Sequence, residues 1–230
     1  MTMAPARPYR SALRAAQSRA TRGRVLQAAT MLFARLGYGG ATMRAVASQA
    51  GVSVPTVEAL FGTKARLLKA SIDVAIAGDD EPVPMLDRDW AAQARAAADP
   101  ESLLATVSGV IAAAQQRSAG LVLSVFEGAA SDPELAGLAR QMSAQRATMA
   151  AWIVGQLAVI APLRPGITGE MATDTVFALM EPALFDRLTR QRDWTTARYR
   201  DWIALSLRHL LVPDEAAAPG SRPSRRRAST

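Results

Sequence analysis

The sequence contains no cysteine, and His209 is its only histidine. These absences exclude a zinc site built from cysteine and histidine, and they exclude a thiol nucleophile. A serine–histidine–aspartate triad would have to use His209, which lies near the end of a predicted helix. Carboxylates are not clustered either, so we expect a protein that is not an enzyme and binds no metal. A lack of cysteine is typical of reducing compartments, and we expect a cytoplasmic protein.

Long apolar runs are absent as well. The longest stretch without a charged residue, 147–163, is shorter than the roughly 20 residues of a membrane-spanning helix, so we expect a buried helix and no membrane partner. The N-terminus is basic, but no apolar segment follows it, so no secretory signal is predicted; an arginine-rich transit peptide is the alternative. No glycine-rich phosphate loop is present, because GYGG at 37–40 follows a helix and stops it, and no cofactor is expected.

Half of the residues are apolar and a fifth are charged, which allows a sizeable core. Alanine is abundant, and no segment alternates apolar and polar residues long enough to predict a strand, so we predict an all-α fold. The pattern divides the chain into a flexible basic arm (1–18), a small helical domain (19–70), a larger helical domain (71–212) and a disordered tail (213–230). An acidic, proline-containing loop at 78–88 is the clearest interruption between helices.

Positive charge is concentrated at the front of the chain. Residues 1–70 contain eleven lysines and arginines but one acid, Glu58, which gives them a net charge of +10. The remaining residues carry a net charge of −3. A basic front part on a mildly acidic body is typical of a protein that binds a polyanion with one part only.

Glycine, serine and threonine mark the ends of short helices in this basic part. An apolar stripe predicts a first helix over 19–36, which ends at Gly37. Three further helices each follow a residue that suits an N-cap: 43–50 after Thr42, 54–61 after Ser53, and 64–77 after Thr63.

The second and third of these helices, within 42–61, have the spacing of a helix-turn-helix. Gly51 begins the tight turn between them, and Ala47 lies four residues earlier, where a small side chain lets the helices cross closely. The N-terminal turn of the third helix then faces outward and fits the major groove of DNA. Pro55 in that turn presents an apolar face suited to a thymine methyl group, and the free amides there favour a phosphate.

These residues resemble a known family over about residues 19–70. The resemblance lies in LFARLGYGGAT before the helix-turn-helix, in Ala50–Ser53 followed by Thr56, Phe61 and Lys64, and in GTKARLL; it is to the TetR family of bacterial repressors. It implies an N-terminal three-helix DNA-binding domain, and a larger helical domain that binds an effector and dimerises. It also implies that double-stranded DNA is contacted by Thr42, Met43, Arg44, Ser53, Val54, Pro55, Thr56, Glu58 and Lys64.

Glu58 departs from the family pattern, in which tyrosine is usual and contacts a phosphate. A carboxylate is repelled by phosphate, but it can accept a hydrogen bond from cytosine N4. Glu58 is therefore either a residue that reads a base or a sign that this protein docks differently. Lys64, at a helix N-terminus, is implied to reach a phosphate.

Four arginines lie before or at the start of the predicted first helix. They can follow the DNA backbone or enter a neighbouring minor groove. The alternative is a solvated tail with no partner. The residues are Arg7, Arg10, Arg14 and Arg19.

The last two long helical segments, 168–190 and 195–211, resemble the dimerisation helices of the family more loosely. Two such helices from each subunit can form a four-helix bundle across a two-fold axis, and an intramolecular core is the alternative. The residues expected at this homodimer interface are Val176, Met180, Leu184, Tyr199, Trp202, Ile203 and Leu210.

The helices between these regions carry methionine and aromatic side chains. In the family this region encloses an inducer pocket, and such side chains suit a small apolar effector, although they are also typical of a plain core. Glu127 lies in an apolar stretch and needs a partner if it is buried. The expected pocket residues are Trp90, Phe126, Glu127, Met142, Met149, Trp152 and Phe177.

Together these patterns predict a DNA-binding transcriptional regulator. We expect a homodimeric repressor that binds a palindromic operator and is released by a small apolar effector. The alternative is a non-specific architectural DNA-binding protein, which would show steep salt dependence without sequence preference.

Overall fold

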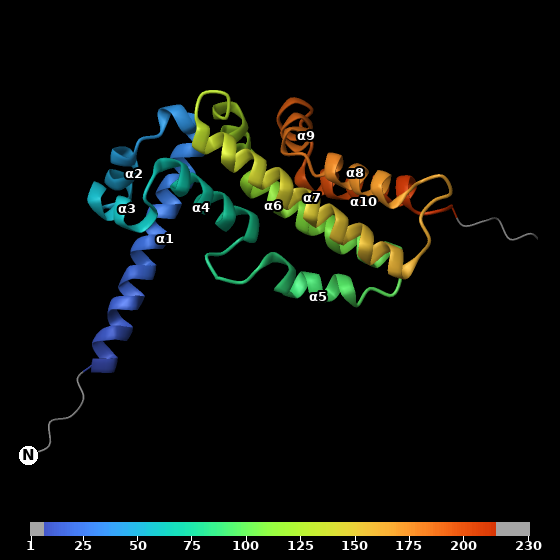
Figure 1. The fold of residues 1–230 in the computed structure, drawn as a ribbon, viewed down its shortest axis with the longest axis horizontal. Coiled ribbons are helices and arrows are strands. Elements are labelled where there is room, and N and C mark those ends of the chain that lie inside the picture. The colour runs from blue at the N-terminus through green and yellow to red at the C-terminus, as the bar shows by residue number, and fades with distance from the viewer. Residues whose placement is uncertain (1–6, 215–230) are drawn as a thin grey trace, which may run out of the picture.

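The computed structural model describes the backbone of residues 7–214 and the side chains of residues 14–214. The regular structure in that range is helical and contains no strand, which confirms the all-α prediction. Figure 1 shows α1–α4 at one end of the molecule, and the long helices α6 and α7 running away from them. The helices are α1 (Arg7–Gly40), α2 (Met43–Ala50), α3 (Val54–Phe61), α4 (Lys64–Ala77), α5 (Asp89–Arg95), α6 (Pro100–Gly128), α7 (Pro133–Ile160), α8 (Gly169–Leu179), α9 (Pro182–Asp186) and α10 (Thr196–Leu211).

Local sequence signals set the bounds of α2, α3 and α4, which coincide with the predicted ranges. The hydroxyl of each predicted N-cap accepts a hydrogen bond from the backbone N–H three residues later. These bonds run from Ala45 to Thr42 at 3.1 Å, from Thr56 to Ser53 at 3.2 Å and from Arg66 to Thr63 at 3.2 Å. Each bond satisfies an amide that has no partner within the first helical turn.

The first helix is longer than the sequence predicts. It begins at Arg7, so the prediction of a flexible arm was wrong for 7–18; residues 1–6 lie outside the described residues. The segment 9–22 contains no glycine or proline that would stop a helix, and its alanines and arginines are strong helix formers. At its other end α1 is kinked at Gly37, whose φ of +65° is unfavourable for residues with a Cβ.

The larger domain differs from the prediction at two places. The apolar pattern of the sequence predicts two separate helices over 101–116 and 119–130, but residues 100–128 form one continuous helix, α6. Conversely, the single helix predicted over 168–190 is broken: α8 ends at Leu179, and α9 starts at Pro182. Proline causes the break because it has no N–H and its ring clashes with the preceding helical turn. The amide of Gln115 on α6 donates to the carbonyl oxygen of Met180 at 2.6 Å, which supplies a partner at this break.

Two apolar cores share α6 and α7. In the first core, α1–α4 pack on the C-terminal part of α6 and the beginning of α7, and Leu67, Leu68 and Ile72 of α4 are almost fully buried there. In the second, α5, α8 and α10 pack on the remaining parts of the two long helices, around the buried Tyr199 and Ile203. The fourth helix therefore fixes the N-terminal helices to the larger domain.

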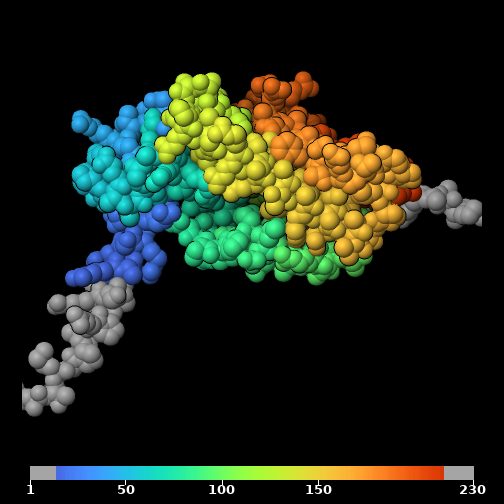
Figure 2. Space-filling model, viewed as in Figure 1, coloured from blue at the N-terminus to red at the C-terminus, as the bar shows by residue number. Residues whose placement is uncertain are grey.

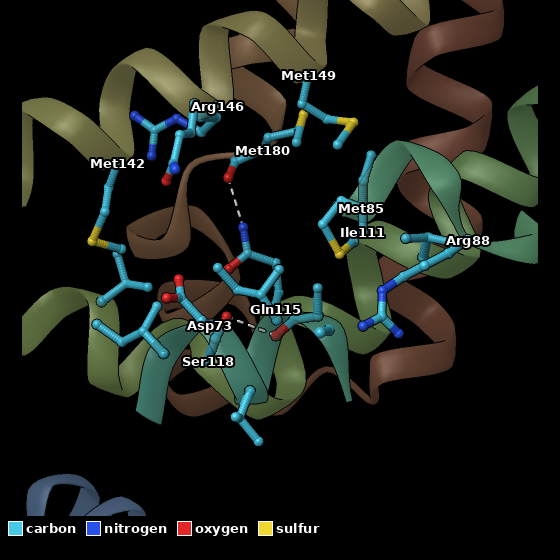
Figure 3. A pocket seen from close by; sticks show the side chains of 18 of the residues that line it. Asp73, Met85, Arg88, Ile111, Gln115, Ser118, Met142, Arg146, Met149 and Met180 are labelled. Carbon is cyan, nitrogen blue, oxygen red and sulfur yellow. Dashed lines mark hydrogen bonds between the residues drawn. The ribbon is translucent and has the colours of Figure 1, made fainter. Parts of the chain in front are cut away.

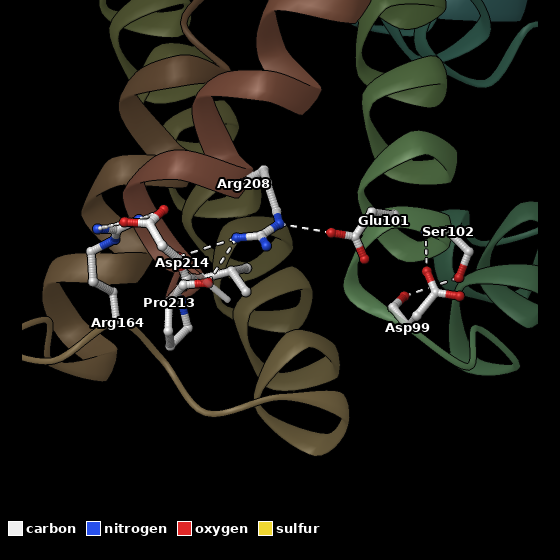
Figure 4. Close-up of polar contacts among 8 residues, drawn as sticks. Asp99, Glu101, Ser102, Arg164, Arg208, Pro213 and Asp214 are labelled. Atoms are coloured by element: carbon white, nitrogen blue, oxygen red, sulfur yellow. Dashed lines mark hydrogen bonds and ion pairs between the residues drawn. The ribbon is translucent and has the colours of Figure 1, made fainter. Parts of the chain in front are cut away.

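Ion pairs close the end of the bundle that lies far from the N-terminal helices (Figure 4). The guanidinium of Arg208 on α10 donates to Glu101 of α6 at 2.7 Å and to the carbonyl oxygen of Pro213 at 2.9 Å. Arg164, in the loop after α7, pairs with Asp214 at 2.8 Å and lowers the pKa of that carboxyl. These contacts order the chain as far as Asp214, whereas the remainder of the predicted disordered tail, 215–230, lies outside the described residues.

Two glycines of α6 are expected to respond in opposite ways to replacement by alanine. A Cβ at Gly128 would collide with the fully buried side chain of Leu135 on α7, whereas a Cβ at Gly109 would meet nothing within 4 Å. We expect Gly128→Ala to lower the free energy of unfolding by about 1–3 kcal/mol through overpacking. Gly109→Ala should raise it by about 0.5–1 kcal/mol, because glycine is the poorer helix former. Urea unfolding measures both, and a shift in the same direction for the two variants would contradict this packing.

Candidate nucleic-acid interface and effector cavity

The second and third helices form a compact pair with a closed wedge between them. Val46 and Ala47 of α2 and Val57 of α3 are at most 3% exposed, so they fill the space where the helices cross. Gly51 adopts the left-handed conformation, with φ of +65° and ψ of +42°, and its N–H bonds to carbonyl oxygens of α2. An alanine there would be strained, because a Cβ is disfavoured at positive φ.

The outer surface of this pair carries the residues that the sequence predicts to contact DNA. None of the nine is buried in the described structure. The Ser53 and Thr56 hydroxyls lie 2.8 Å apart at the start of α3, so one of them donates to the other and the second proton remains available. Pro55 in the same turn and Arg44 on α2 are exposed as well. The start of α3 therefore presents hydroxyl and amide donors together with an apolar ring, which is the chemistry that phosphate and base edges require.

Lys64, which the sequence analysis expects to reach a phosphate, has partners inside the protein. Its Nζ atom donates to the carbonyl oxygen of Tyr38 at 2.9 Å, and it lies 3.9 Å from the centre of the Tyr38 ring. The side chain is half-buried, and these contacts hold α4 against the kinked end of α1. An ammonium has three donors, so a phosphate contact remains a prediction, but in this structure the lysine joins two helices.

A polar cluster ties the N-terminal helices to the start of α7. The Tyr38 hydroxyl donates to Asp132 at 3.2 Å, and the same carboxylate caps α7 by accepting from the backbone N–H of Glu134. Thr63 donates its hydroxyl to Glu134 at 2.8 Å. Burial, together with the nearby Asp132 carboxylate, raises the pKa of Tyr38 to about 12.

A second ionic contact joins α1 to the loop that follows α4. The guanidinium of Arg22 pairs with Asp80 through two hydrogen bonds of 2.8 and 3.3 Å, and its carbon lies 4.8 Å from the centre of the Phe61 ring. Phe61 is the last residue of α3. Arg22 therefore connects the loop that carries Asp80 to the end of α3.

A cavity of about 500 Å³ lies between α4, the loop after it, α6, α7 and the start of α9 (Figure 3). Apolar side chains make most of its wall, and four of them are methionines, which adapt in shape to a ligand. The methionines are Met85, Met142, Met149 and Met180.

Several polar groups line the cavity, but most of them are already paired. Arg146 of α7 forms an ion pair of 2.5 Å with Glu181 and lies 4.2 Å from the centre of the Phe177 ring. Burial lowers the pKa of this guanidinium, and the neighbouring carboxylate opposes that effect. At the rim Arg88 donates twice to Asp79, and this pairing lowers the pKa of the carboxyl to about 2. An apolar molecule with a small polar part therefore fits this cavity better than a highly charged one.

Comparison with known families gives a direct assignment for the helix-turn-helix. Residues 25–71 match the profile of the family described as bacterial regulatory proteins, tetR family. This match identifies residues 25–71 as a DNA-binding domain of the TetR type. The matched segment covers α2 and α3, together with the C-terminal part of α1 and the beginning of α4.

Solved structures of TetR-type regulators share the fold over most of the chain. A putative TetR-family regulator from Rhodococcus sp. is 16% identical, with a TM-score of 0.63 over 84% of this chain and 98% of its own. NalD, the secondary repressor of the MexAB-OprM multidrug efflux pump in Pseudomonas aeruginosa, is 20% identical, with a TM-score of 0.59 over 85% and 98%. FadR from Bacillus subtilis, solved in complex with stearoyl-CoA, is 16% identical, with a TM-score of 0.61 over 80% and 96%. A search of curated proteins gives no significant match.

Four of the seven predicted pocket residues line the cavity, and three do not. The lining residues are Trp90, Phe126, Met142 and Met149. Glu127 is exposed on α6, one position beyond the face that turns inward. It needs no buried partner, and the prediction that it lines the pocket was wrong. Trp152 and Phe177 are also outside the wall, because the first packs edge-on against Trp90 and the second lies under the guanidinium of α7.

The sequence analysis did not identify the polar residues that line the cavity. Gln115 and Arg146 come from two different helices and meet beside the break before α9. In the sequence, each of them is only a polar residue within an apolar face of a helix. Such residues are common, so neither position indicates a cavity by itself. Their proximity depends on how α6 and α7 cross, which local sequence does not encode.

Several residues expected at the dimer interface are instead buried within a single protomer. Val176, Tyr199 and Ile203 have no exposed surface, so they belong to the intramolecular core that was the alternative. Met180 lines the cavity, and Leu184 and Trp202 are half-buried. Leu210 is exposed and remains available to a partner. Apolar spacing marked the inner side of α8 and α10 correctly as buried, but it assigned that side to the wrong contact.

Residues 7–214 contain no helix long and apolar enough to cross a membrane. The same residues contain no group of three histidine, aspartate or glutamate side chains arranged to hold a metal ion.

The raised pKa of Tyr38 predicts a stability loss at high pH. The folded protein keeps this phenol neutral up to about pH 12, whereas the unfolded chain releases its proton near pH 10. The stabilisation is therefore complete below pH 10 and is lost as the pH rises to about 12. We expect Tyr38→Phe to flatten this part of the stability profile, as measured by urea unfolding at each pH.

Asp132→Asn is the matched control for this titration. Asparagine retains the cap on α7 but removes the negative charge, so near-ultraviolet titration should show the Tyr38 pKa falling toward its ordinary value. A phenol that already titrates near pH 10 in the folded protein would contradict the cluster.

Proposed function

We propose that this protein is a dimeric, ligand-responsive repressor. Residues 19–70 bind a palindromic operator through α2 and α3, and residues 71–212 bind an effector and join the two subunits. The effector binds a conformation in which the DNA-binding domains of the two subunits are too far apart or too close to fit the operator. Its binding therefore releases DNA by a population shift. The protein acts in the cytoplasm, where its DNA is. The observation that carries this proposal is an exposed helix pair, within a basic N-terminal domain, that is linked to an apolar cavity.

Charge and exposure support DNA as the partner of the helix pair. The N-terminal 70 residues carry a net charge of +10, so a polyanion is attracted to this end of the molecule. Arg44 is exposed on α2, and the hydroxyls of Ser53 and Thr56 lie at the start of α3. Glu58 is also exposed, on the outward side of α3, where it can accept from cytosine N4.

The size and wall of the cavity support a small, mostly apolar effector. A volume of about 500 Å³ lies within the range of ligand sites in proteins. FadR, which shares the fold, was solved with stearoyl-CoA, an apolar chain on a polar head. NalD is named as a repressor, which supports the direction of regulation proposed here. The ion pair between Arg146 and Glu181 offers a polar end to such a ligand.

The outer face of α10 supports a dimer contact different from the one the sequence suggested. Leu205 is 56% exposed, and positions 202, 205 and 209 lie on one face of the helix. This face carries Leu205 and His209, which are exposed, and Trp202 at its edge, whose ring also packs against Tyr199 of the second core. A two-fold contact through it would bury exposed apolar surface on both subunits.

One chain of contacts supports communication between cavity and helix pair. Asp80 lies on the cavity rim and holds Arg22 of α1, whose guanidinium stacks on Phe61 at the end of α3. A surface ion pair of this kind contributes only about 0–1 kcal/mol, so it biases the orientation of the helix pair rather than locking it.

Footprinting on the DNA upstream of the protein's own gene tests the proposed function. We expect two protected half-sites about one helical turn apart, related by two-fold symmetry. Arg44→Gln should weaken binding to this site about tenfold, because it removes a contact beside the major groove. Arg187→Gln, which removes an equally exposed charge in the larger domain, should leave the affinity unchanged. Equal affinity for this fragment and for random DNA would instead support the non-specific architectural protein.

Filling the cavity should uncouple the protein from its effector. Ala114 lines the cavity, so Ala114→Phe inserts a ring into the space while leaving the helix pair untouched. We expect unchanged operator affinity, loss of binding of the apolar dye anilinonaphthalene sulfonate, and loss of induction by a library of apolar compounds in a reporter strain. Ala151→Phe, on the exposed side of α7, is the control and should behave like the wild type. Retained dye binding and induction in Ala114→Phe would contradict an effector site here.

A further inference from the structure

Among the described residues, the wall of the cavity between α4, α6 and α7 offers hydrogen-bond acceptors but no free cation. Both arginines of the wall are occupied, since Arg146 pairs with Glu181 and Arg88 donates two hydrogen bonds to Asp79. The two arginine side chains are only 13% and 14% exposed. A negatively charged ligand would have to displace one of these carboxylates, and breaking a largely buried ion pair is strongly unfavourable.

Gln115 of α6 presents an unpaired acceptor to this cavity. The residue is 8% exposed, and its Nε2 atom donates to the carbonyl oxygen of Met180 at 2.6 Å. A carbonyl oxygen can only accept, so this bond fixes the orientation of the amide and leaves Oε1 as its free end. Oε1 accepts no hydrogen bond from residues 7–214, and it is not enclosed by protein atoms, so it faces the cavity. An acceptor buried in this way favours a ligand that brings a donor.

Asp73 of α4 adds a negative charge on the same side of the cavity. Figure 3 shows Asp73 and Gln115 pointing into the cavity from α4 and α6, with Arg146 across from them. The Asp73 carboxylate accepts from Lys69 at 2.6 and 2.8 Å, but this lysine is not part of the cavity wall. A carboxylate has room for about four hydrogen bonds, so Asp73 can still accept from a ligand.

Acids outnumber bases along the cavity wall. Four of the lining residues are acids and two are arginines, which gives the wall a net charge of −2. Glu81 forms no ion pair within residues 14–214. A hollow with apolar walls and an excess of one charge concentrates ligands of the opposite charge, so this cavity attracts cations and repels anions. The acids are Asp73, Asp79, Asp80 and Glu81.

Aromatic side chains enclose the cavity and suit a cation as well. Figure 2 shows α5 and the loop before it (green) adjoining α7 (yellow) on the face in view, where Trp90 packs edge-on against Trp152 with 5.5 Å between ring centres. Trp90 and Phe126 both line the cavity, and the face of an aromatic ring attracts a positive charge. A hydrogen bond to Gln115 is strengthened where protein atoms replace water around it.

We propose that the effector is an apolar molecule with one protonated amine. Its apolar part lies among the methionines of the wall, an N–H of the ammonium donates to Oε1 of Gln115, and the Asp73 carboxylate stabilises the positive charge. Fatty acids and other apolar anions are excluded, because they meet the acids of the wall and find no free arginine. This assignment rests on the proposed function only in taking the cavity as the effector site.

Calorimetric titration of the full-length protein with compounds that share one apolar group tests the ligand class. The compounds are phenylbutylamine, its quaternary analogue phenylbutyltrimethylammonium, phenylbutanol and phenylbutyrate. We expect the amine to bind at least about tenfold more tightly than the others, because only the amine combines a positive charge with an N–H donor. Ala114→Phe, which fills the cavity, should abolish this binding. Phenylbutyrate binding as tightly as the amine would overturn the proposal.

Two variants separate the charge from the hydrogen bond. Asp73→Asn keeps the shape of the side chain but removes its charge, so the preference for the amine over phenylbutanol should disappear. Asp186→Asn is the matched control, because it also leaves the cation one helical turn later, here Arg190, without its partner, but lies outside the wall. Gln115→Met removes the acceptor at similar volume, so the amine should lose its advantage over the quaternary analogue.

Folding of these variants is checked by their thermal midpoints. The Asp73 side chain is 53% exposed, and its surface ion pair contributes only about 0–1 kcal/mol, so Asp73→Asn should melt like the wild type and decides the test even if Gln115→Met does not fold. A preference for the amine that persists in Asp73→Asn as in Asp186→Asn would contradict the assignment.

Release of operator DNA by the same compounds distinguishes failure of this proposal from failure of the proposed function. If the protein is not a ligand-responsive repressor, the amine still binds with its preference but leaves the DNA complex intact. If only the ligand class is wrong, phenylbutanol or phenylbutyrate binds and releases the DNA at least as well as the amine. Tight binding of the amine with selective release of DNA supports both.

Discussion

The packing of α4 between two bodies of helices is the constraint on which the rest of the structure depends. Leu67, Leu68 and Ile72 belong to a core that α4 shares with α1 and α6, so the N-terminal helices are packed directly against the larger domain. Arg117 of α6 holds the other end of α4 by donating to the carbonyl oxygens of Ala75 and Ile76. A buried apolar contact therefore joins α6 to the N-terminal helices, and this contact is stiff because protein interiors are close-packed.

The sequence predicted those features that depend on neighbouring residues. The N-caps at Thr42, Ser53 and Thr63 and the turn at Gly51 are determined by local hydrogen bonds and by the φ that glycine allows, so the helix-turn-helix could be placed to the residue. Exposure of the predicted DNA-contacting residues follows from the same local geometry. The continuation of α1 to Arg7 was missed because charge suggested a loose arm, whereas helix propensity determined its conformation.

Features that depend on contacts between distant residues could not be predicted in this way. An apolar stripe shows that a side of a helix is buried, but it does not show whether a partner subunit or the same chain buries it, and Tyr199 and Ile203 illustrate the second case. The cavity is defined by the crossing of α6 and α7, by the break at Pro182 and by the loop after α4. Glu127 shows the limit clearly, since its neighbour Phe126 lines the cavity and a single step along the helix turns the carboxylate to solvent.

The cavity itself is the strongest structural argument for regulation. A protein of this size gains stability by filling its interior, and each unfilled volume forfeits dispersion contacts along its wall. Here about 500 Å³ remains open beside a helix that is broken at Pro182, where Gln115 must satisfy the carbonyl of Met180 from another helix. An unfilled volume and a break in a helix therefore occur at the same place. Such coincident departures are expected where a ligand, rather than the protein, completes the packing, and α4 lies directly between that place and the DNA-binding surface.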